Sequence, residues 1–473
     1  MIGCVLASAT VLALAVPGAA FAFDPDDPAF SGWDGHPGEA GSFGSSGSFG
    51  GSGGSGSVGG AGDLDDAIDW DALSKLRGDS GPDGSTSAAP GASPGTAPDV
   101  PGGVGDFDAL SAAFANATPD GDTVRITSSM TVEGPGHVLT LKPKAVLTLD
   151  LGMYGIGDMP VVLGKGSTLR ITGTTGSLTA SGPLDPNNPG RTAGIQTTDA
   201  TLIVDGGTVY ATGTAEYIHS SGAGIGGSLS AAGGTLVVNG GRVIATGGLG
   251  GAGIGTGCDH KYLGNYSLKA DAGSITINGG TVEATGGNGG PADGAHLVGQ
   301  GGGAGIGGGL FRSGGSITNN GGDVTASGGI GAAGIGSGSV AISPFISTVN
   351  LKNGGTVTIN GGDVTAIAGE SASAIGGGYV AHGATVAITG GTVIAKQGTG
   401  APTAIGGGPK GWGASFPKFG SLSITAPGIL SLPEGAVLDV PAGATVSGNG
   451  AVSGAGKVVF QGNGTLPWDL TKR

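Results

Sequence analysis

Short runs of alternating hydrophobic and polar residues, each closed by a pair of glycines, recur along the chain. In SITINGGTVEATGG the alternation places Val282 and Ala284 on one face and Thr281, Glu283 and Thr285 on the other. A period of two predicts strands, and the glycine pairs predict tight corners between them. Six such copies occupy residues 201–214, 235–248, 274–287, 316–329, 356–369 and 385–398.

A shorter motif of the type GAGIGG stands between successive copies, so each repeat contains three short apolar stretches. Strands this short cannot bury a face alone. In coils stacked ~4.8 Å apart, however, equivalent residues of successive coils pair with each other and share one core. We therefore predict an all-β fold, a three-sided right-handed parallel β-helix whose third side is short. Two buried columns are expected: Val209, Val243, Val282, Val324, Val364 and Val393, and Ile195, Ile225, Ile254, Ile306, Ile335, Ile375 and Ile405.

A polar residue precedes the first glycine pair of every copy. These residues are Asp205, Asn239, Asn278, Asn320, Asn360 and Thr389. Stacked at one corner, they would form a ladder of hydrogen bonds along the solenoid axis, and we predict a structural role for it.

The folded domain is predicted to begin at residue 106. Asp106 can cap a helix over 106–117, in which Phe107, Leu110 and Phe114 share a face with Ala117. Such a helix would cover the hydrophobic end of the stack. The domain is expected over 106–473, with the repeats at about 190–420 and regular coils at 421–470.

Composition separates the repeats from an acidic leader. Of 473 residues 110 are glycine and only 11% are charged, which argues against a helix-rich enzyme. Residues 1–22 resemble an export signal, with an apolar run and an Ala-Phe-Ala site. Residues 23–105 are rich in Gly, Ser and Pro and are predicted to be a disordered acidic linker, although the spacing of apolar residues also allows a short helix over 63–77.

Insertions of variable length follow the GAGIGG-type motif of successive coils, so we expect them to line one edge of the solenoid. Eight of the 12 aromatic residues after Arg191 lie in these insertions. Aromatic side chains on rigidly held loops are a common sugar-binding surface, and lysines beside them can meet anionic sugar groups. In the alternative, the rings pack onto the solenoid and seal the loops. The candidate binding residues are Tyr262, Tyr266, Phe345, Tyr379, Trp412, Phe416, Phe419, Lys410 and Lys418, with Trp412 expected to contribute most; Phe311 is the eighth ring.

Candidate metal ligands are few. Cys258, Asp259 and His260 form the densest group, and His219 or His296 would have to complete it. This motif is weak, and no metal or cofactor is predicted.

Acidic residues are dispersed over the repeats. Asp323 and Asp363 occupy equivalent positions and form a row that is an alternative ion or substrate site, but no grouping typical of an acid-base pair is found. The net charge of −15 and the lack of a basic stripe argue against a nucleic-acid partner. No segment after the export signal is apolar enough to span a membrane.

The cap helix, the strand in DGDTVRI, the two repeat phrases and the closing LSLPEGAVLDVPAGATVSGNGAVSGAGKVVF carry a family resemblance. Over about 107–470 the chain resembles secreted bacterial right-handed parallel β-helix proteins of the pectate-lyase-like superfamily, especially glycine-rich surface proteins, adhesins and carbohydrate-binding members. That scaffold hosts lyases, hydrolases, binders and adhesins, so the resemblance implies the fold and leaves the activity open.

We therefore predict a secreted or cell-surface, non-catalytic β-helix protein that binds a glycan or a host-surface ligand through one edge. The first alternative is an extracellular polysaccharide lyase or glycoside hydrolase on the same scaffold. The second is a structural spacer or matrix protein. Nothing in the sequence indicates an oligomeric state.

Overall fold

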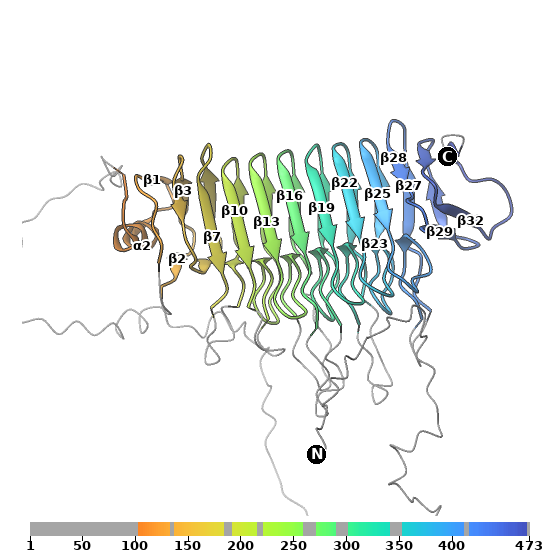
Figure 1. Cartoon of the computed structure of the whole chain (residues 1–473), viewed down its shortest axis with the longest axis horizontal. Coiled ribbons are helices and arrows are strands. Elements are labelled where there is room, and N and C mark those ends of the chain that lie inside the picture. The colour runs from red at the N-terminus through yellow and green to blue at the C-terminus, as the bar shows by residue number, and fades with distance from the viewer. Residues whose placement is uncertain are drawn as a thin grey trace, which may run out of the picture. The chain divides into compact units, whose positions relative to one another are not determined.

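The computed structural model describes residues 103–132, 137–183, 192–214, 221–258, 271–289, 301–340, 352–410 and 416–470. The predicted export signal, nearly all of the acidic leader and the alternative helix at 63–77 lie outside these residues. The described residues form a stack of coils built from three parallel sheets, as predicted (Figure 1).

Sheets I and II form two of the three sides, and all neighbouring strands in them are parallel. Sheet I has 11 strands: β1 (Asp122–Arg125), β3 (Val146–Asp150), β6 (Thr168–Thr172), β9 (Thr201–Val204), β12 (Thr235–Val238), β15 (Ser274–Ile277), β18 (Ser316–Asn319), β21 (Thr356–Ile359), β24 (Thr385–Ile388), β27 (Ser421–Ile424) and β30 (Thr445–Ser447). Sheet II has 10 strands: β4 (Gly155–Ile156), β7 (Ser177–Ser181), β10 (Thr208–Thr212), β13 (Arg242–Thr246), β16 (Thr281–Thr285), β19 (Asp323–Ser327), β22 (Asp363–Ile367), β25 (Thr392–Lys396), β28 (Ile429–Ser431) and β31 (Ala451–Ser453).

Sheet III is the short third side, as predicted from the AGIG phrase. Its nine strands are β2 (Leu139–Leu141), β5 (Val161–Leu163), β8 (Ile195–Gln196), β11 (Ile225–Gly226), β14 (Ile254–Gly255), β17 (Ile306–Gly307), β20 (Ile335–Gly336), β23 (Ile375–Gly376) and β26 (Ile405–Gly406). Most of them contain only an isoleucine and a glycine.

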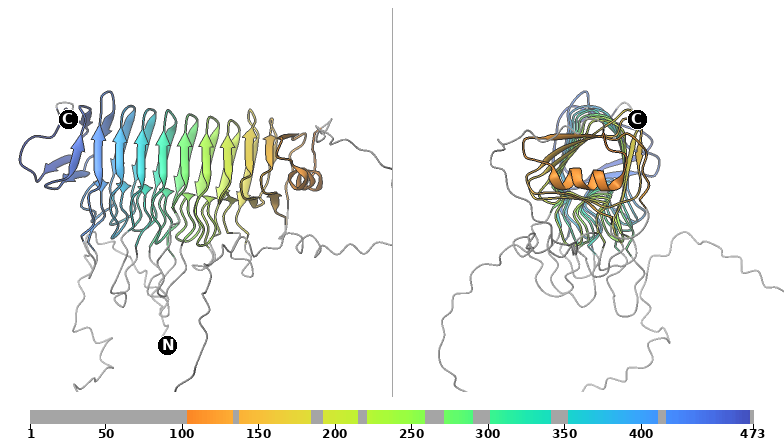
Figure 2. Two further views of the ribbon diagram at one scale, coloured as in Figure 1. Left: turned by 180° about the vertical axis from the view of Figure 1, so that it is seen from behind. Right: turned by 90° about the vertical axis from the view of Figure 1, so that its left-hand side faces the viewer.

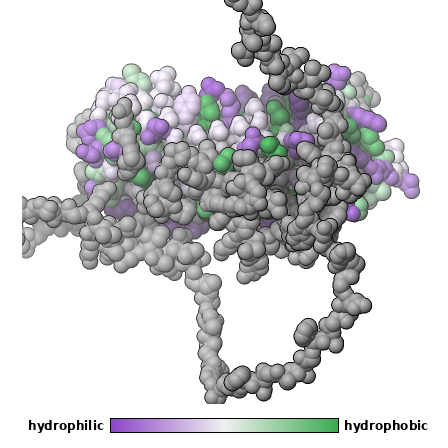
Figure 3. Space-filling view, turned by 60° about the horizontal axis from the view of Figure 1, so that its bottom comes forward, coloured by the Kyte–Doolittle hydropathy of each residue, from purple (hydrophilic) through white to green (hydrophobic). Residues whose placement is uncertain are grey.

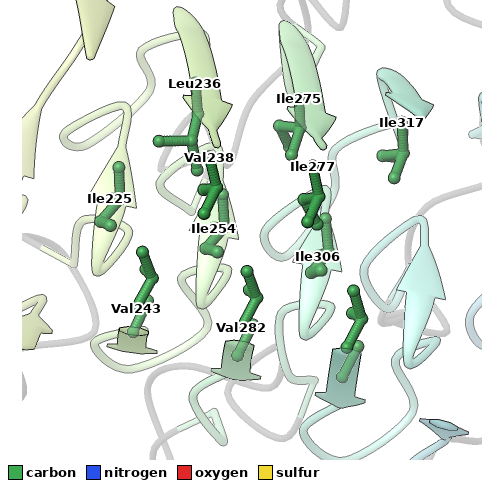
Figure 4. Packing of buried hydrophobic residues seen from close by; sticks show 14 of the residues in the cluster. Ile225, Leu236, Val238, Val243, Ile254, Ile275, Ile277, Val282, Ile306 and Ile317 are labelled. Atoms are coloured by element: carbon green, nitrogen blue, oxygen red, sulfur yellow. The ribbon is translucent and has the colours of Figure 1, made fainter. Parts of the chain in front are cut away.

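The two predicted columns are confirmed. Val282 pairs in register with Val243 and Val324, and Ile306 pairs with Ile254 and Ile335. Every valine and isoleucine of the two columns is at most 4% exposed. Figure 4 shows part of each column pointing into the common interior.

Six of the nine sheet III strands contain a glycine, and it is required by both backbone conformation and space. Gly226, Gly255, Gly307, Gly336, Gly376 and Gly406 have φ values from 127° to 141°. A Cβ on any of the first five would lie 1.8 to 2.3 Å from the carbonyl oxygen of the next glycine in the column. A side chain there would therefore force neighbouring coils apart.

The polar column is also confirmed as a hydrogen-bonded ladder at the corner between sheets I and II. Asn239 donates its side-chain amide to Asp205 at 2.7 Å. The next three asparagines each donate to the one before at 2.7 to 2.8 Å, and the Thr389 hydroxyl donates to Asn360 at 2.7 Å. All donors point the same way, toward the Asp205 carboxylate, which is paired with Arg170. Aligned bonds of this kind polarise one another.

Helix α2 (Phe107–Asn116) covers the first coil, as predicted, and lies across the end of the stack in the right-hand view of Figure 2. Asp106 is its N-cap and accepts from the backbone N–H of Ala109 at 2.9 Å. Leu110 and Phe114 are fully buried beneath it. Val104, two residues before the predicted boundary, is also buried and bridges to Ile126.

At the other end the coils are less regular than predicted for 421–470. Sheets I and II continue to β30 and β31, but β29 (Val437–Val440) and β32 (Lys457–Phe460) pair with each other and do not extend sheet III. Trp468 is 5% exposed, and its indole N–H donates to the carbonyl oxygen of Ser447 at 2.8 Å. This indole lies against β30, the last strand of sheet I.

Candidate functional site

The corner between sheets III and I, called here the loop corner, carries the insertions. The residues that open it stack in one column: a Cβ on Gly309 would lie 2.4 Å from the carbonyl oxygen of Gly257, one on Gly338 2.0 Å from that of Gly309, and one on Gly408 2.0 Å from that of Gly378. The insertions that follow these glycines therefore leave from equivalent corners, as the sequence predicts.

From residue 228 onward, short turns and long insertions alternate along this corner, whereas the earlier coils have short turns only. The short turns at 228–233, 309–314 and 378–383 have six residues each, whereas the intervening segments 257–272, 338–354 and 408–419 have 16, 17 and 12. The third residue of each short turn is left-handed without being glycine: Ser230 has φ 58°, Phe311 62° and Val380 59°. Because the same strained conformation recurs at the same position, the three short turns share one backbone conformation.

Each short turn is hydrogen-bonded to the base of a long insertion. The backbone N–H of Ser230 donates to the carbonyl oxygen of Cys258 at 2.8 Å, and that of Phe311 donates to Ser339 at 2.9 Å. In the third case Val340 donates to Tyr379 at 2.9 Å. The bases of the long insertions are thus held by the scaffold.

The described aromatic residues of this corner divide into packed and exposed rings. Phe311 and Tyr379 are partly buried against a small apolar cluster that contains Val340 and Val380, and Phe419 packs against the main core. These three follow the alternative in which rings seal the loops. Phe416, by contrast, is 74% exposed. The predicted Tyr262, Tyr266, Phe345 and Trp412 lie outside the described residues.

Phe416 is paired with a cation. The Lys410 ammonium lies 4.1 Å from the centre of the Phe416 ring, within the range of a cation–π contact. Both side chains are exposed. The exposed aromatic ring of Phe416 and the positive charge of Lys410 therefore lie side by side at the surface.

Lys418 is coupled to a histidine in the preceding coil. The backbone N–H of Lys418 donates to Nδ1 of His382 at 2.9 Å, so the neutral imidazole carries its proton on Nε2. Burial of the ring, and secondly the charge of Lys418, lower the pKa of His382. A neutral ring that carries its proton on Nε2 thus lies beside the lysine.

The lowered pKa of His382 predicts a loss of stability in acid. The unfolded chain binds the proton more readily than the folded one, so the contribution of this group is complete above its ordinary value of 6.5 and is lost as the pH falls below it. His382→Asn keeps an acceptor near the Nδ1 position but cannot titrate. We expect the melting temperature of this variant to fall less than that of the parent between about pH 7 and about pH 5. An equal fall in both proteins would contradict this assignment.

Sequence reasoning named Lys410 and Lys418 but missed that the later loop corner lacks acidic residues. Segments 309–314, 338–354, 378–383 and 408–419 contain no aspartate or glutamate, in a chain of net charge −15. They carry Arg312, Lys352, Lys410 and Lys418, and the first two are buried. Sorting the charges by corner, and not along the chain, would have revealed this edge.

The predicted acidic row exists on the outer face of sheet II. Asp323 and Asp363 immediately precede the paired Val324 and Val364, and both aspartates are exposed. Among the described residues no group of three His, Cys, Asp or Glu side chains could hold a metal ion. Cys258 is buried, while Asp259, His260, His219 and His296 lie outside the described ranges.

Figure 3 views the molecule with the lower edge of Figure 1 brought forward. Among the residues coloured there, apolar side chains are scattered singly between polar ones and form no continuous patch. The described part of the chain has no helix that is long and apolar enough to cross a membrane. Comparisons of the chain with known protein families, with curated proteins and with solved structures found no match.

Proposed function

We propose that this protein is a secreted or cell-surface glycan-binding protein of the adhesin type, and that it holds its ligand along the loop corner. The observation that supports this most is the alternation of short turns and long insertions from residue 228 onward, in which the base of each long insertion is bonded to a short turn. A rigid scaffold lowers the ordering cost of binding, and insertions repeated along it allow several weak contacts to act together.

The exposed Phe416 with Lys410 indicates how sugars would be recognised. Sugar rings stack on aromatic faces, and a cation next to the ring favours sugars that bear carboxylate or sulfate groups. The lack of acidic residues in the later loop corner supports the same preference, because no like charge repels an anionic sugar.

The test is an array of neutral, carboxylated and sulfated glycans probed with the full-length protein. Phe416→Ala is expected to weaken binding about fivefold, or about 1 kcal/mol, because a stacking face is lost. Lys410→Ala should weaken binding to the anionic glycans more than to the neutral ones. Tyr210→Ala is the matched control, since Tyr210 is 40% exposed on the outer face of sheet II.

Two outcomes would contradict the proposal. One is an array without any bound glycan, which would favour the structural spacer. The other is an equal loss of binding in the Tyr210 and Phe416 variants. Steady release of reducing ends from an acidic polysaccharide, abolished by Asp323→Asn, would favour the lyase or hydrolase alternative.

A further inference from the structure

Four consecutive rungs of the polar ladder consist of an asparagine followed by glycine. These pairs are Asn239-Gly240, Asn278-Gly279, Asn320-Gly321 and Asn360-Gly361. All four asparagines are exposed. Glycine has no Cβ and leaves the approach of its own backbone nitrogen to the preceding side chain open.

We propose that the ladder is a site of spontaneous deamidation, in which Asn320 and Asn360 react before Asn239 and Asn278. The backbone nitrogen of the following glycine loses its proton and attacks Cγ of the asparagine. The bond from Cγ to the side-chain nitrogen breaks, and that nitrogen leaves as ammonia. Water then opens the resulting succinimide to aspartate or isoaspartate, so that one amide is exchanged for one carboxylate.

The order of reaction follows from the glycine N–H groups. Gly240 donates to the carbonyl oxygen of Val204 at 3.3 Å, and Gly279 donates to that of Val238 at 3.4 Å. Within the described residues the N–H groups of Gly321 and Gly361 have no such acceptor. A hydrogen-bonded N–H gives up its proton less readily, so the last two nitrogens are the better nucleophiles.

A local change in the core accompanies this difference at the two later corners. Asn319 stands in sheet I where neighbouring coils have Ile277 and Ile359, and it is 3% exposed. Its side chain accepts from the N–H of Gly322 at 3.0 Å and donates to the carbonyl oxygen of Gly361 at 2.9 Å. These bonds tie the corners of two adjacent coils to a buried amide, which the earlier corners lack.

Deamidation would also change the ladder itself. A carboxylate at position 320 keeps its acceptor role toward Asn360 but cannot donate to Asn278, whose oxygen lies 2.7 Å from the present amide nitrogen. The column already contains one carboxylate, Asp205, at the end where Arg170 balances it. Among the described rungs from Asn239 to Thr389 no comparable ion pair is present. The product therefore adds an unbalanced charge.

The experiment follows folded full-length protein during prolonged incubation at mildly alkaline pH, with peptide mapping by mass spectrometry. Deamidation at Asn320 and Asn360 is expected several-fold faster than at Asn239 and Asn278. Asn449-Gly450 is the internal reference and should be slow, because the Gly450 N–H donates to Ile424 at 2.7 Å. In urea all five sites should react at similar rates, since all are Asn-Gly pairs.

Gly321→Ala is the matched variant. Its new Cβ would lie 3.2 Å from the carbonyl oxygen of Asn278, the mildest contact among the ladder glycines that follow asparagine. It should slow the reaction at Asn320 several-fold and leave Asn360 unchanged. Rates at Asn320 and Asn360 equal to that at Asn449 in the folded protein would overturn the proposal, as would intact amides at both positions.

Discussion

Val324→Asp is expected to lower the free energy of unfolding by about 4 kcal/mol, because it places a charge in a dry core. Val324 is 4% exposed and lies between Val282 and Val364 in the buried column. No described side chain of that column could pair with a carboxylate. Urea unfolding followed by circular dichroism gives the measurement.

Thr365→Asp is the control for this substitution. Thr365 lies on the adjacent strand β22, points outward and pairs with Thr325 and Ile394. A charge there stays in water, so the expected change is within about 0.5 kcal/mol. Similar losses in the two variants would show that the valine column is not a continuous dry core.

Gly307→Ala is expected to destabilise the protein by about 4 kcal/mol, although it adds a single methyl group. The backbone at Gly307 has φ 138°, and the new Cβ would lie 1.9 Å from the carbonyl oxygen of Gly336. Backbone strain and steric overlap each contribute about 1 to 3 kcal/mol. The loss would be read from the midpoint of urea unfolding.

Gly443→Ala separates the two contributions. Gly443 also has a positive φ, 76°, but no atom lies within 4 Å of the position of its missing Cβ. Only the backbone strain remains, and it should cost about 1 kcal/mol. If both alanine variants lost the same stability, the close stacking of sheet III would not explain its glycines.

The coil architecture could be predicted from the sequence because each coil pairs equivalent residues. Val282 lies between Val243 and Val324, and Asn278 lies between Asn239 and Asn320. Residues at equivalent positions of successive repeats therefore form columns in the structure. The cap helix was recognisable for a similar reason, since Asp106 and the apolar spacing after it are local signals. Val104 has no such signal, and its pairing with Ile126 depends on the first coil being formed.

The loop corner was predictable in position but not in detail. Insertions carry no repeat, so the sequence could not show that Tyr379 packs against Val340 while Phe416 is exposed. Nor could it show that His382 accepts from Lys418, because this contact joins two coils of different insertion length. Side-chain burial at such sites is decided by neighbours that are distant in the chain.

The alternation of short turns and long insertions also bears on how such a protein can change. Long insertions occur in every second coil. Their bases are therefore about 9.6 Å apart along the solenoid axis at the usual strand spacing. We therefore expect that an insertion can be lengthened, exchanged or replaced by a foreign peptide while the coils stay unchanged. The valine and isoleucine columns would keep their register, because the base of each insertion is bonded to a short turn. On this basis we expect the fold to accept peptides grafted after Gly257, Gly338 and Gly408.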